Sequence, residues 1–255
     1  MSEHKIKGVV LAGGQGTRFR PLTYYFQKCM IPVGEDQKPV LEYIVRLFSH
    51  HGIRDLVLLV GYKYQQVKNY FNDGGRFGVN LSYVLDRPGF IGSANALMNA
   101  HRQGVISRDD FLVVYYGDIL SNFDLKGMVT QHLESNAVAT IGLAHGFKVR
   151  VGTAEIKDGV ITRFIEKPEL DQPVSVGILV LSGDVLEEMD SLYKERPEKA
   201  FDLMGDVIPH LIAKGMPVRP YISDDFWYDL GSLERYESFE NEGLSERLNF
   251  LSKRA

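Results

Sequence analysis

The fold of this chain is constrained most by a series of short apolar runs separated by longer stretches. Residues 9–11, 56–60 and 111–116 are apolar at consecutive positions, which is typical of parallel strands buried on both faces. Residues 40–48 instead repeat their apolar side chains with the spacing of a helix. Further strands are expected at 81–85, 138–143 and 174–181, and helices at 64–71, 94–101, 123–133, 185–193 and 207–213, with Pro39 in the first turn of the first helix.

This alternation predicts an α/β fold, with a Rossmann-like, doubly wound and mostly parallel sheet covered by helices on both faces. The pattern changes after about residue 145. Residues 153–156 and 160–165 flank Asp158-Gly159, a two-residue hairpin signal, so antiparallel strands are expected to be added there. No repeat, low-complexity segment or Pro/Gly/Ser-rich linker divides the chain, and residues 1–255 are therefore expected to form a single domain.

Composition excludes several classes of function. The 255 residues carry a net charge of -4, so the basic field that a nucleic-acid binder needs is absent. The single cysteine, Cys29, cannot form an internal disulfide, in agreement with a reducing compartment. Residues 1–8 are polar, unlike a signal peptide, and no apolar stretch reaches 18 residues. The protein is therefore expected to be cytoplasmic, without a membrane or nucleic-acid partner.

A glycine-rich loop, Gly13-Gly14-Gln15-Gly16-Thr17-Arg18, directly follows the first expected strand. Glycines let the main chain approach a ligand and point several amides at one spot, and such concavities bind phosphate. Arg18 adds a bidentate donor for phosphate oxygens. The loop is not a P-loop, and Phe19 stands where a dinucleotide fingerprint needs a third glycine or alanine. A tight turn between strand and helix is the alternative interpretation of the glycines alone.

The residues after the loop make the pattern more specific. Pro21-Leu22-Thr23 and then Lys28-Cys29-Met30-Ile31-Pro32 follow it. Together with the loop, these elements resemble the signature of the sugar-1-phosphate nucleotidylyltransferases, although Cys29 stands where that family usually has proline. The resemblance implies that Arg18 and Lys28 act on the phosphates and, with Asp118, form the catalytic set. It further implies a nucleotide-binding set of Leu11, Ala12, Gly13, Gly14, Gly16, Thr17, Arg18, Lys28 and Gly92.

Two aspartates follow expected strands. Asp118 comes after residues 111–116, at a carboxyl end of the sheet, where open α/β sheets bind ligands, and Asp229 comes after residues 226–228. Each taken singly also fits a turn. Mg²⁺ takes one or two carboxylates together with substrate phosphates. In the family that the chain resembles, a Gly-Asp and a Trp-x-Asp-x-Gly provide the metal ligands, so the resemblance implies that Asp118 and Asp229 hold Mg²⁺.

Residues of the second half resemble the sugar-phosphate side of the same family. Glu166-Lys167-Pro168 matches its Glu-Lys-Pro element, which implies that Lys167 neutralises the phosphate of the sugar while Glu166 accepts hydrogen bonds from its hydroxyls. Gly152 corresponds to a glycine near the sugar. Ser175-Val176-Gly177 stands where relatives usually carry Asn-Ala-Gly, so Ser175 and Gly177 are also expected beside the sugar.

The resemblance to this family is less complete in the region expected to bind the nucleoside. Gly92-Ser93-Ala94 resembles a Gly-Thr-Ala segment that opens a helix beside the nucleoside, where helix amides are expected to be free for ribose or phosphate. Residues 86–90 lie in the region that usually reads the base in that family, and they do not match a reader of uracil, thymine or guanine convincingly. Mannose 1-phosphate with GTP, and glucose 1-phosphate with UTP or dTTP, therefore stay open.

The resemblance runs from Val9 to about Tyr236. It implies transfer of a nucleotidyl group from a nucleoside triphosphate to a sugar 1-phosphate, with release of pyrophosphate. Residues of about 1–145 would form the nucleotide-binding half and about 146–255 the sugar-phosphate-binding half. The hexapeptide repeats of the C-terminal β-helix that some relatives carry are not present in the sequence, so the transferase core alone is expected. The oligomeric state is open, with a homo-oligomer as one outcome, since relatives often form dimers or tetramers.

Two other functions are alternatives for this sequence. A catalytically silent homologue that binds sugar nucleotides and regulates a partner would be favoured by loss of Arg18, Lys28, Asp118 or Asp229, and all four are present. A glycosyltransferase that uses a finished sugar nucleotide would favour an Asp-x-Asp, and the sequence at Asp118 is Gly-Asp-Ile-Leu. Nucleotidyl transfer is the function that the sequence predicts.

Overall fold

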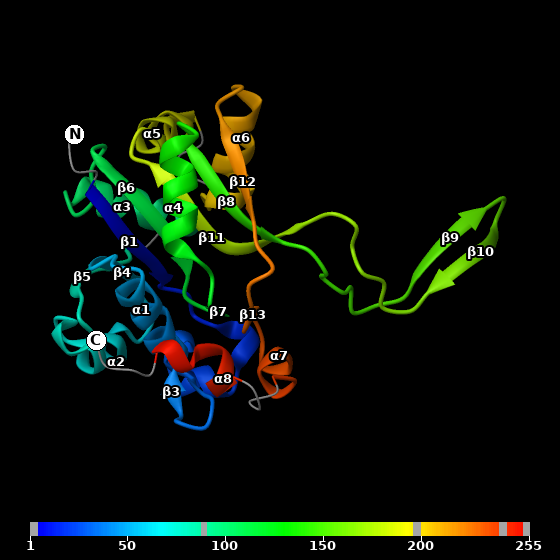
Figure 1. Cartoon of the computed structure of the whole chain (residues 1–255), viewed down its shortest axis with the longest axis horizontal. Helices are drawn as coiled ribbons and strands as arrows, with labels where there is room; N and C mark the ends of the chain where they lie inside the picture. Colours follow the sequence, from blue (N-terminus) through cyan, green and yellow to red (C-terminus); the bar gives the residue numbers. More distant parts are fainter. Residues whose placement is uncertain (1–4, 88–90, 196–199, 240–243, 252–255) are drawn as a thin grey trace.

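A seven-stranded sheet forms the centre of the molecule, in the order β12-β8-β11-β6-β1-β4-β5 (Figure 1). The structure, a computed structural model, describes residues 5–87, 91–195, 200–239 and 244–251. The strands of the sheet are β1 (Lys5–Ala12), β4 (Asp55–Val60), β5 (Asn80–Leu85), β6 (Asp110–Tyr116), β8 (Ala139–Ala144), β11 (Val174–Ser182) and β12 (Val218–Ile222).

The sheet is mixed but mostly parallel. β1 pairs in parallel with β4 and β6, β4 with β5, and β12 with β8. β11 lies between β6 and β8 and is antiparallel to both. The predicted fold class is therefore confirmed. The edge strand β12 was not predicted, because Pro220 interrupts its pattern, and an edge position is where a strand tolerates proline.

Helices cover both faces of the sheet, and two hydrophobic clusters form the core. On β1, Val10 packs into one cluster and Val9 into the other, because successive strand residues point to opposite faces. The first cluster includes side chains of α1 and α4, and the second includes side chains of α3, α5 and α6. The main helices are α1 (Val40–His50), α2 (Tyr64–Phe71), α3 (Ser93–Arg102), α4 (Leu125–Glu134), α5 (Val185–Glu195) and α6 (Ile208–Ala213).

Several helix starts differ by one or two residues from the sequence prediction, and the reason is visible at α1 and α4. Pro39 is not in the first turn of α1 but in the short strand β3 (Lys38–Pro39), which pairs with β2 (Pro32–Val33). α4 begins at Leu125 instead of residue 123, because the Asp124 side chain caps it by accepting from the Gly127 amide at 2.9 Å. Both helices were predicted as helices, but the short strand that contains Pro39 was not predicted.

Short elements surround the carboxyl edge of the sheet. β7 (Ile119–Ser121) pairs antiparallel with β13 (Trp227–Asp229) and so joins the end of β6 to the C-terminal part of the chain. The remaining elements are the 3-10 turns η1 (Thr17–Phe19), η2 (Leu22–Tyr24), η3 (Lys28–Met30), η4 (Gly75–Phe77) and η6 (Asn249–Leu251), the π-helical turn η5 (Leu203–Val207), and the helices α7 (Leu233–Glu237) and α8 (Leu244–Leu248).

The predicted hairpin forms but does not join the central sheet. β9 (Thr153–Lys157) and β10 (Val160–Ile165) pair only with each other. The turn between them places Asp158 and Gly159 at φ values of 52° and 78°, as the primed hairpin turns require. This hairpin, called the arm below (residues 153–165), projects far from the rest of the molecule (Figure 1). No helix in the described residues is long and apolar enough to cross a bilayer.

Candidate active site

The glycine-rich loop closes over the carboxyl end of β1 and lines a cavity of about 250 Å³, called the loop cavity below. Gly16 has a φ of 61°, and a Cβ there would lie 2.8 Å from the Thr23 side chain, so the turn requires glycine. The Thr23 hydroxyl donates to the Gly16 carbonyl at 2.9 Å and fixes it. Of the predicted residues, the loop cavity is lined by Leu11, Ala12, Gly14, Gly16, Thr17, Arg18, Lys28 and Asp118.

The segment that carries Lys28 is held against β1 by a buried glutamine. Gln27 donates from its side-chain amide to the Ala12 carbonyl at 2.7 Å, and its side-chain oxygen accepts from the Cys29 amide at 2.6 Å. A proline at position 29 would have no N–H for the second bond. The departure at Cys29 therefore adds a hydrogen bond to this loop, and the Lys28 ammonium beside it forms an ion pair with the Asp118 carboxylate.

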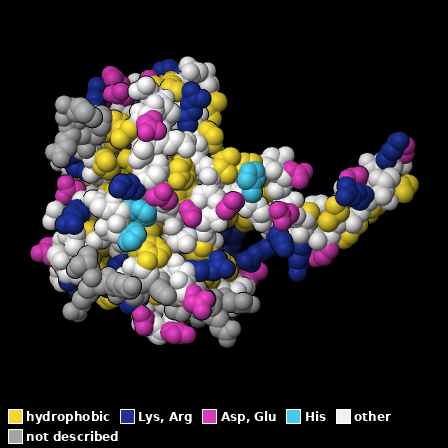
Figure 2. Space-filling view, viewed as in Figure 1, with side chains coloured by type: hydrophobic (Ala, Val, Ile, Leu, Met, Phe, Trp, Pro, Cys, Tyr) yellow, Lys and Arg dark blue, Asp and Glu magenta, His cyan; other side chains and the backbone are white. Residues whose placement is uncertain are grey.

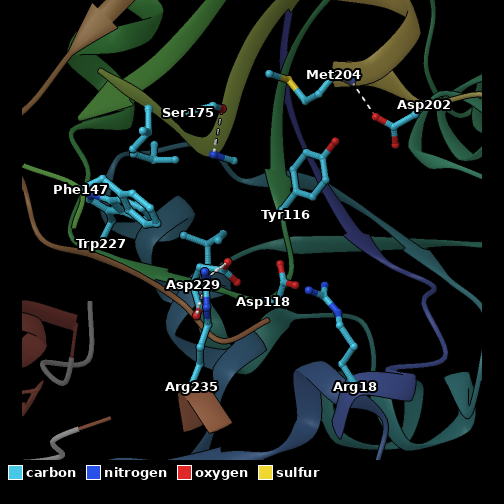
Figure 3. Close-up of a pocket in the computed structure, with 14 residues that line it drawn as sticks. Arg18, Tyr116, Asp118, Phe147, Ser175, Asp202, Met204, Trp227, Asp229 and Arg235 are labelled. Atoms are coloured by element: carbon cyan, nitrogen blue, oxygen red, sulfur yellow. Dashed lines mark hydrogen bonds and ion pairs between the residues drawn. The ribbon is translucent and has the colours of Figure 1, made fainter. Parts of the chain in front are cut away.

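The two aspartates lie side by side although they are distant in sequence (Figure 3). Asp118 follows β6, and the pairing of β13 with β7 places Asp229 opposite Ile119. The Leu230 amide donates to the Asp118 carbonyl at 2.8 Å. Both carboxylates face one cavity of about 430 Å³, called the outer cavity below, and Arg18 and Asp118 line this cavity and the loop cavity alike.

The electrostatics of the pair suit a cation. Burial raises the pKa of Asp229, and the charge of Asp118 raises it further, whereas Arg235, Lys28 and Arg18 lower it. The two carboxylates therefore repel each other, and a cation between them would relieve that repulsion. No group of three or more acidic, histidine or cysteine ligands exists in the described residues. A pair of carboxylates still fits Mg²⁺, which takes few protein ligands and fills its shell with phosphate and water.

The outer cavity continues from the aspartates toward β11. Ser175 and Gly177, both predicted beside the sugar, line it. Gly177 has a φ of 75°, and its amide donates to the Ser175 hydroxyl at 3.4 Å. Phe147 and Trp227 form one wall, with their rings stacked at 6.1 Å between centroids (Figure 3). The cavity thus combines a flat aromatic wall with polar and charged groups, as sites for small polar ligands do.

Three of the predicted sugar-phosphate residues do not reach the outer cavity. Gly152, Glu166 and Lys167 lie at the base of the arm, and within the described part of the chain they line neither cavity. Gly152 packs under the arm, where a Cβ would lie 2.4 Å from Phe164 and 2.9 Å from a Glu166 carboxylate oxygen. The structure therefore brings Gly152 and Glu166 together, but apart from Asp118 and Asp229. Their role in binding sugar phosphate stays a prediction.

Gly92 occupies a different environment from the one expected. It has a φ of 104°, and a Cβ on it would lie 2.2 Å from the Phe201 carbonyl oxygen. The amides of Ala94 and Asn95 donate to that same carbonyl at 3.1 and 3.3 Å. The expectation that the first amides of α3 are free for a ligand is therefore wrong for Ala94 and Asn95, because the Phe201 carbonyl already accepts from both.

The structure adds residues that sequence reasoning missed. Arg235 of α7 forms an ion pair with Asp229, and no motif pointed to it because it lies on a separate helix. Tyr116 lines both cavities, and its only signal was its place at the end of the most apolar strand. Asp86 follows β5, and its carboxylate lies against Gly13 and Gly61, where added Cβ atoms would be 1.9 and 2.6 Å away.

The Asp86 carboxylate is half-buried and has no partner among the described residues. Burial raises its pKa to about 6, and no hydrogen bond or ion pair from the described residues reaches its side chain. An unpartnered, half-buried carboxylate costs stability, so it is expected where it serves a ligand. Gly13 was predicted to bind nucleotide. Because it has no side chain, the Asp86 carboxylate can approach the glycine-rich loop there.

Fold and cavities together define a doubly wound α/β protein whose cavities, at the carboxyl edge of its sheet, are lined by a glycine-rich loop, Arg18 and two aspartates. The family model described as nucleotidyl transferase matches residues 7–246. The chain belongs to the nucleotidyl transferase family, and its resemblance to the sugar-1-phosphate nucleotidylyltransferases is confirmed.

Named relatives support the same family. The chain is 32% identical over 247 residues to a UTP–glucose-1-phosphate uridylyltransferase of Synechocystis sp.. The matched region covers 91% of this chain and 61% of that protein. It is 31% identical to a glucose-1-phosphate thymidylyltransferase of Streptomyces antibioticus (89% and 63%) and 28% identical to a mannose-1-phosphate guanylyltransferase of Mycobacterium tuberculosis (92% and 64%). The chain therefore spans less than two thirds of the length of these relatives.

Solved structures share the fold at low identity. A Bacillus anthracis protein in complex with sucrose superposes with a TM-score of 0.73 at 23% identity, covering 96% of this chain and 99% of that one. HddC from Yersinia pseudotuberculosis, complexed with GMP-PN, gives a TM-score of 0.66 at 19% identity, covering 91% and 96%.

Proposed function

We propose that this chain catalyses nucleotidyl transfer from a nucleoside triphosphate to a sugar 1-phosphate, with release of pyrophosphate. One observation carries the proposal: two aspartates from distant parts of the chain share the outer cavity with Arg18, and Asp118 and Arg18 also line the adjoining loop cavity with Lys28 and the glycine-rich loop. The reaction needs phosphates to be positioned and their charge to be stabilised, and it needs no protein nucleophile.

Each group has a role that follows from its place. The loop amides and Arg18 bind the triphosphate, and Lys28 stabilises negative charge that develops on the α-phosphate and on pyrophosphate. Asp118 and Asp229 would hold Mg²⁺, which supplies Lewis-acid stabilisation of the phosphate oxygens when it is bound. The outer cavity, with Ser175, Gly177 and its aromatic wall, accepts the sugar 1-phosphate and places its phosphate for in-line attack.

The order of the strands supports a position for the nucleoside beside Asp86. Since the outer cavity lies on the β11 side of Asp118, a triphosphate over the β1 loop extends its nucleoside toward β4 and β5, where Asp86 lies. A carboxylate accepts two hydrogen bonds side by side, which matches the N1–H and the amino group of guanine. Uracil and thymine offer one N–H between two carbonyls and would leave a carbonyl facing a carboxylate oxygen. We therefore infer that GTP is the preferred donor.

Pyrophosphate release tests both parts of the proposal. The purified chain is incubated with GTP, UTP, dTTP, ATP or CTP, each with mannose 1-phosphate or glucose 1-phosphate, in the presence of Mg²⁺. Release that depends on the sugar phosphate, and that is greatest with GTP, is the expected result. Absence of pyrophosphate with every pair would overturn nucleotidyl transfer, whereas a preference for a pyrimidine nucleotide would overturn only the role of Asp86.

A comparison of GTP with inosine triphosphate sharpens the test of the base. Inosine lacks the 2-amino group, so it forms one of the two hydrogen bonds to Asp86. Loss of one hydrogen bond to a charged group, worth about 1.5–3 kcal/mol, predicts a fall in kcat/KM of roughly 10- to 150-fold. Equal use of the two nucleotides would show that the carboxylate does not contact that amino group.

A further inference from the structure

The Asp229 carboxylate, one of the two expected to hold Mg²⁺, forms an ion pair with the guanidinium of Arg235. The pair is open to water, because the side chains of Arg235 and Asp229 are 27% and 31% exposed. Ion pairs with such access to water contribute little to stability. A second cation at Asp229 would repel the guanidinium, and its displacement would cost the fold little.

The backbone of Arg235 is fixed, whereas its long side chain has room to change direction. The Arg235 amide donates to the Ser232 hydroxyl at 3.3 Å, and its carbonyl accepts from the Tyr228 hydroxyl at 2.8 Å. Ser232 and Tyr228 lie on either side of Asp229 in the sequence. The Arg235 side chain lines two cavities, the outer cavity and one at the base of the arm, so the guanidinium can leave Asp229 by side-chain rotation alone.

Charge favours the outer cavity for the displaced guanidinium. The cavity at the base of the arm, about 340 Å³, is lined by Lys148 and Arg150, and among the described residues Asp229 is the only carboxylate that lines it. Figure 2 shows Lys and Arg side chains gathered between the body and the base of the arm. A further cation is repelled there. The outer cavity instead presents the carboxylates of Asp118 and Asp202.

The outer cavity needs positive charge before it can hold a phosphate. In the described part of the chain, the charged side chains that line it are those of Arg18, Asp118, Asp202, Asp229 and Arg235. A phosphate that enters beside three carboxylates is repelled unless cations face it. Arg18 is assigned to the triphosphate, and Lys167 does not line this cavity. Arg235 is the remaining cationic side chain in it.

We propose that Arg235 binds the phosphate of the sugar 1-phosphate after a divalent cation has displaced it from Asp229. A guanidinium presents paired N–H donors that match two oxygens of one phosphate. The exchange couples two binding events, because the cation that occupies the aspartate pair also releases the group that the sugar phosphate needs. This inference rests on the proposed nucleotidyl transfer and adds to that site a residue that selects the phosphate of the acceptor.

Titration with Tb³⁺, which like Ca²⁺ takes oxygen ligands, tests the exchange without turnover. Trp227, the only tryptophan of the sequence, lines the outer cavity with Asp229, so its excitation makes Tb³⁺ bound there emit. Arg235→Gln removes the competing cation and is expected to lower the half-saturating Tb³⁺ concentration roughly two- to fivefold, the range for a partly exposed ion pair. Arg108→Gln, which removes an exposed ion pair with Glu187 before β6, is the control. Equal or weaker Tb³⁺ binding in Arg235→Gln would overturn the exchange.

Steady-state kinetics with Mg²⁺ test the contact with the sugar phosphate. With mannose 1-phosphate or glucose 1-phosphate, whichever the wild-type chain uses better, Arg235→Gln is expected to raise the KM of the sugar phosphate at least about tenfold, as loss of charge-assisted hydrogen bonds predicts. The KM of the triphosphate is expected to change less than about twofold. Arg235→Lys keeps the charge without the paired donors, so its KM for the sugar phosphate is expected to lie between those of the wild type and Arg235→Gln.

The outcomes separate this inference from the proposed function. An active wild type with an unchanged KM for the sugar phosphate in Arg235→Gln would overturn the role of Arg235 and leave nucleotidyl transfer intact. An equal rise in both KM values would also overturn it, because that result assigns Arg235 to the general shape of the site. A wild-type chain without turnover would overturn the proposed function, and the Tb³⁺ titration would still decide whether Arg235 competes with a cation for Asp229.

Discussion

At the scale of single residues, the sequence predicted the place of a side chain best where the residue directly follows a strand. Asp118 was predicted because it follows the most apolar strand, and the structure places its carboxylate at the carboxyl edge of the sheet. Arg235 was not predictable, because only the packing of α7 brings it to Asp229. Glu166 and Lys167 matched a motif, but a motif does not fix the direction in which a hairpin leaves the body.

Replacement of Asp118 tests the metal and catalytic role directly. Asp118→Asn keeps the size of the side chain and removes its charge, so turnover is expected to fall at least about 100-fold. The thermal midpoint is expected to change little, since the loss of the ion pair with Lys28 is offset by removal of the repulsion between Asp118 and Asp229. Pyrophosphate release and a thermal scan measure the two effects. Asp109→Asn, an exposed carboxylate before β6, is the control, and undiminished turnover in Asp118→Asn would exclude the role.

Asp86→Asn separates the ligand role of Asp86 from its cost to the fold. The raised pKa, about 6, means that the folded state ionises this carboxyl less readily than the unfolded state does. Its contribution to stability therefore falls as pH rises from about 4 to 6, and above pH 6 the variant is expected to be more stable by about 1 kcal/mol, allowing for partial exposure. The kcat/KM for GTP is expected to fall at least tenfold. Denaturant unfolding and kinetics with GTP measure both; a less stable variant would contradict this account.

At the scale of elements, local signals predicted the type of each element better than its limits. The Asp158-Gly159 turn predicted the hairpin, because both residues adopt positive φ values readily. The start of α1 was misplaced because Pro39 fits an extended strand end as well as a helix start. The amides at the start of α3 were expected to be free, and only the tertiary contact with Phe201 reveals their partner.

The short segment η3 depends on one buried side chain. Gln27→Leu keeps the approximate size but leaves the Ala12 carbonyl and the Cys29 amide without their partner. We expect a loss of roughly 2–4 kcal/mol in the free energy of unfolding, since two buried polar groups become unsatisfied. KM for the triphosphate is expected to rise because Lys28 is displaced. Denaturant unfolding and steady-state kinetics measure these effects, and Gln65→Leu on the exposed side of α2 is the control. Equal stability of the two variants would contradict the role of Gln27.

At the scale of the whole molecule, the strand–helix alternation was sufficient to predict the doubly wound sheet, and the order of its strands was not predictable. The apolar runs indicate that the strands are buried, but they do not indicate which strands are neighbours in the sheet. The division into a nucleotide-binding half and a sugar-phosphate-binding half stays a prediction. β11, from the second half, lies between β6 and β8 of the first, so the two halves share one sheet.

The stability of the whole fold is expected to decrease in acid because of His132. This side chain is buried between α4 and the sheet, with hydrogen bonds to Thr140 at 2.8 Å and Ser182 at 3.1 Å. Burial lowers its pKa from 6.5 to about 4, so between these values the unfolded state binds the proton more readily. Stability is therefore lost as pH falls from about 6.5 to 4, by on the order of 2 kcal/mol.

Urea unfolding at several pH values measures this loss. His132→Gln does not titrate, so its free energy of unfolding is expected to change less over the same range than that of the wild-type chain. His101→Gln serves as the comparison, because the His101 ring contacts a single carbonyl, that of Ile106, outside the cluster around His132. Identical pH profiles for the wild type and His132→Gln would assign the acid sensitivity to other groups.

The position of β11 also determines when the fold can be completed during synthesis. Both of its neighbours, β6 and β8, emerge from the ribosome before it, and the arm is made between β8 and β11. Until residues 174–182 are available, the nascent chain carries two open strand edges with a gap of one strand between them. When β11 fills that gap, residues that are far apart along the chain come into contact, and such contacts form slowly. A nascent chain halted before residue 174 is thus the species most exposed to wrong edge pairing and to capture by chaperones.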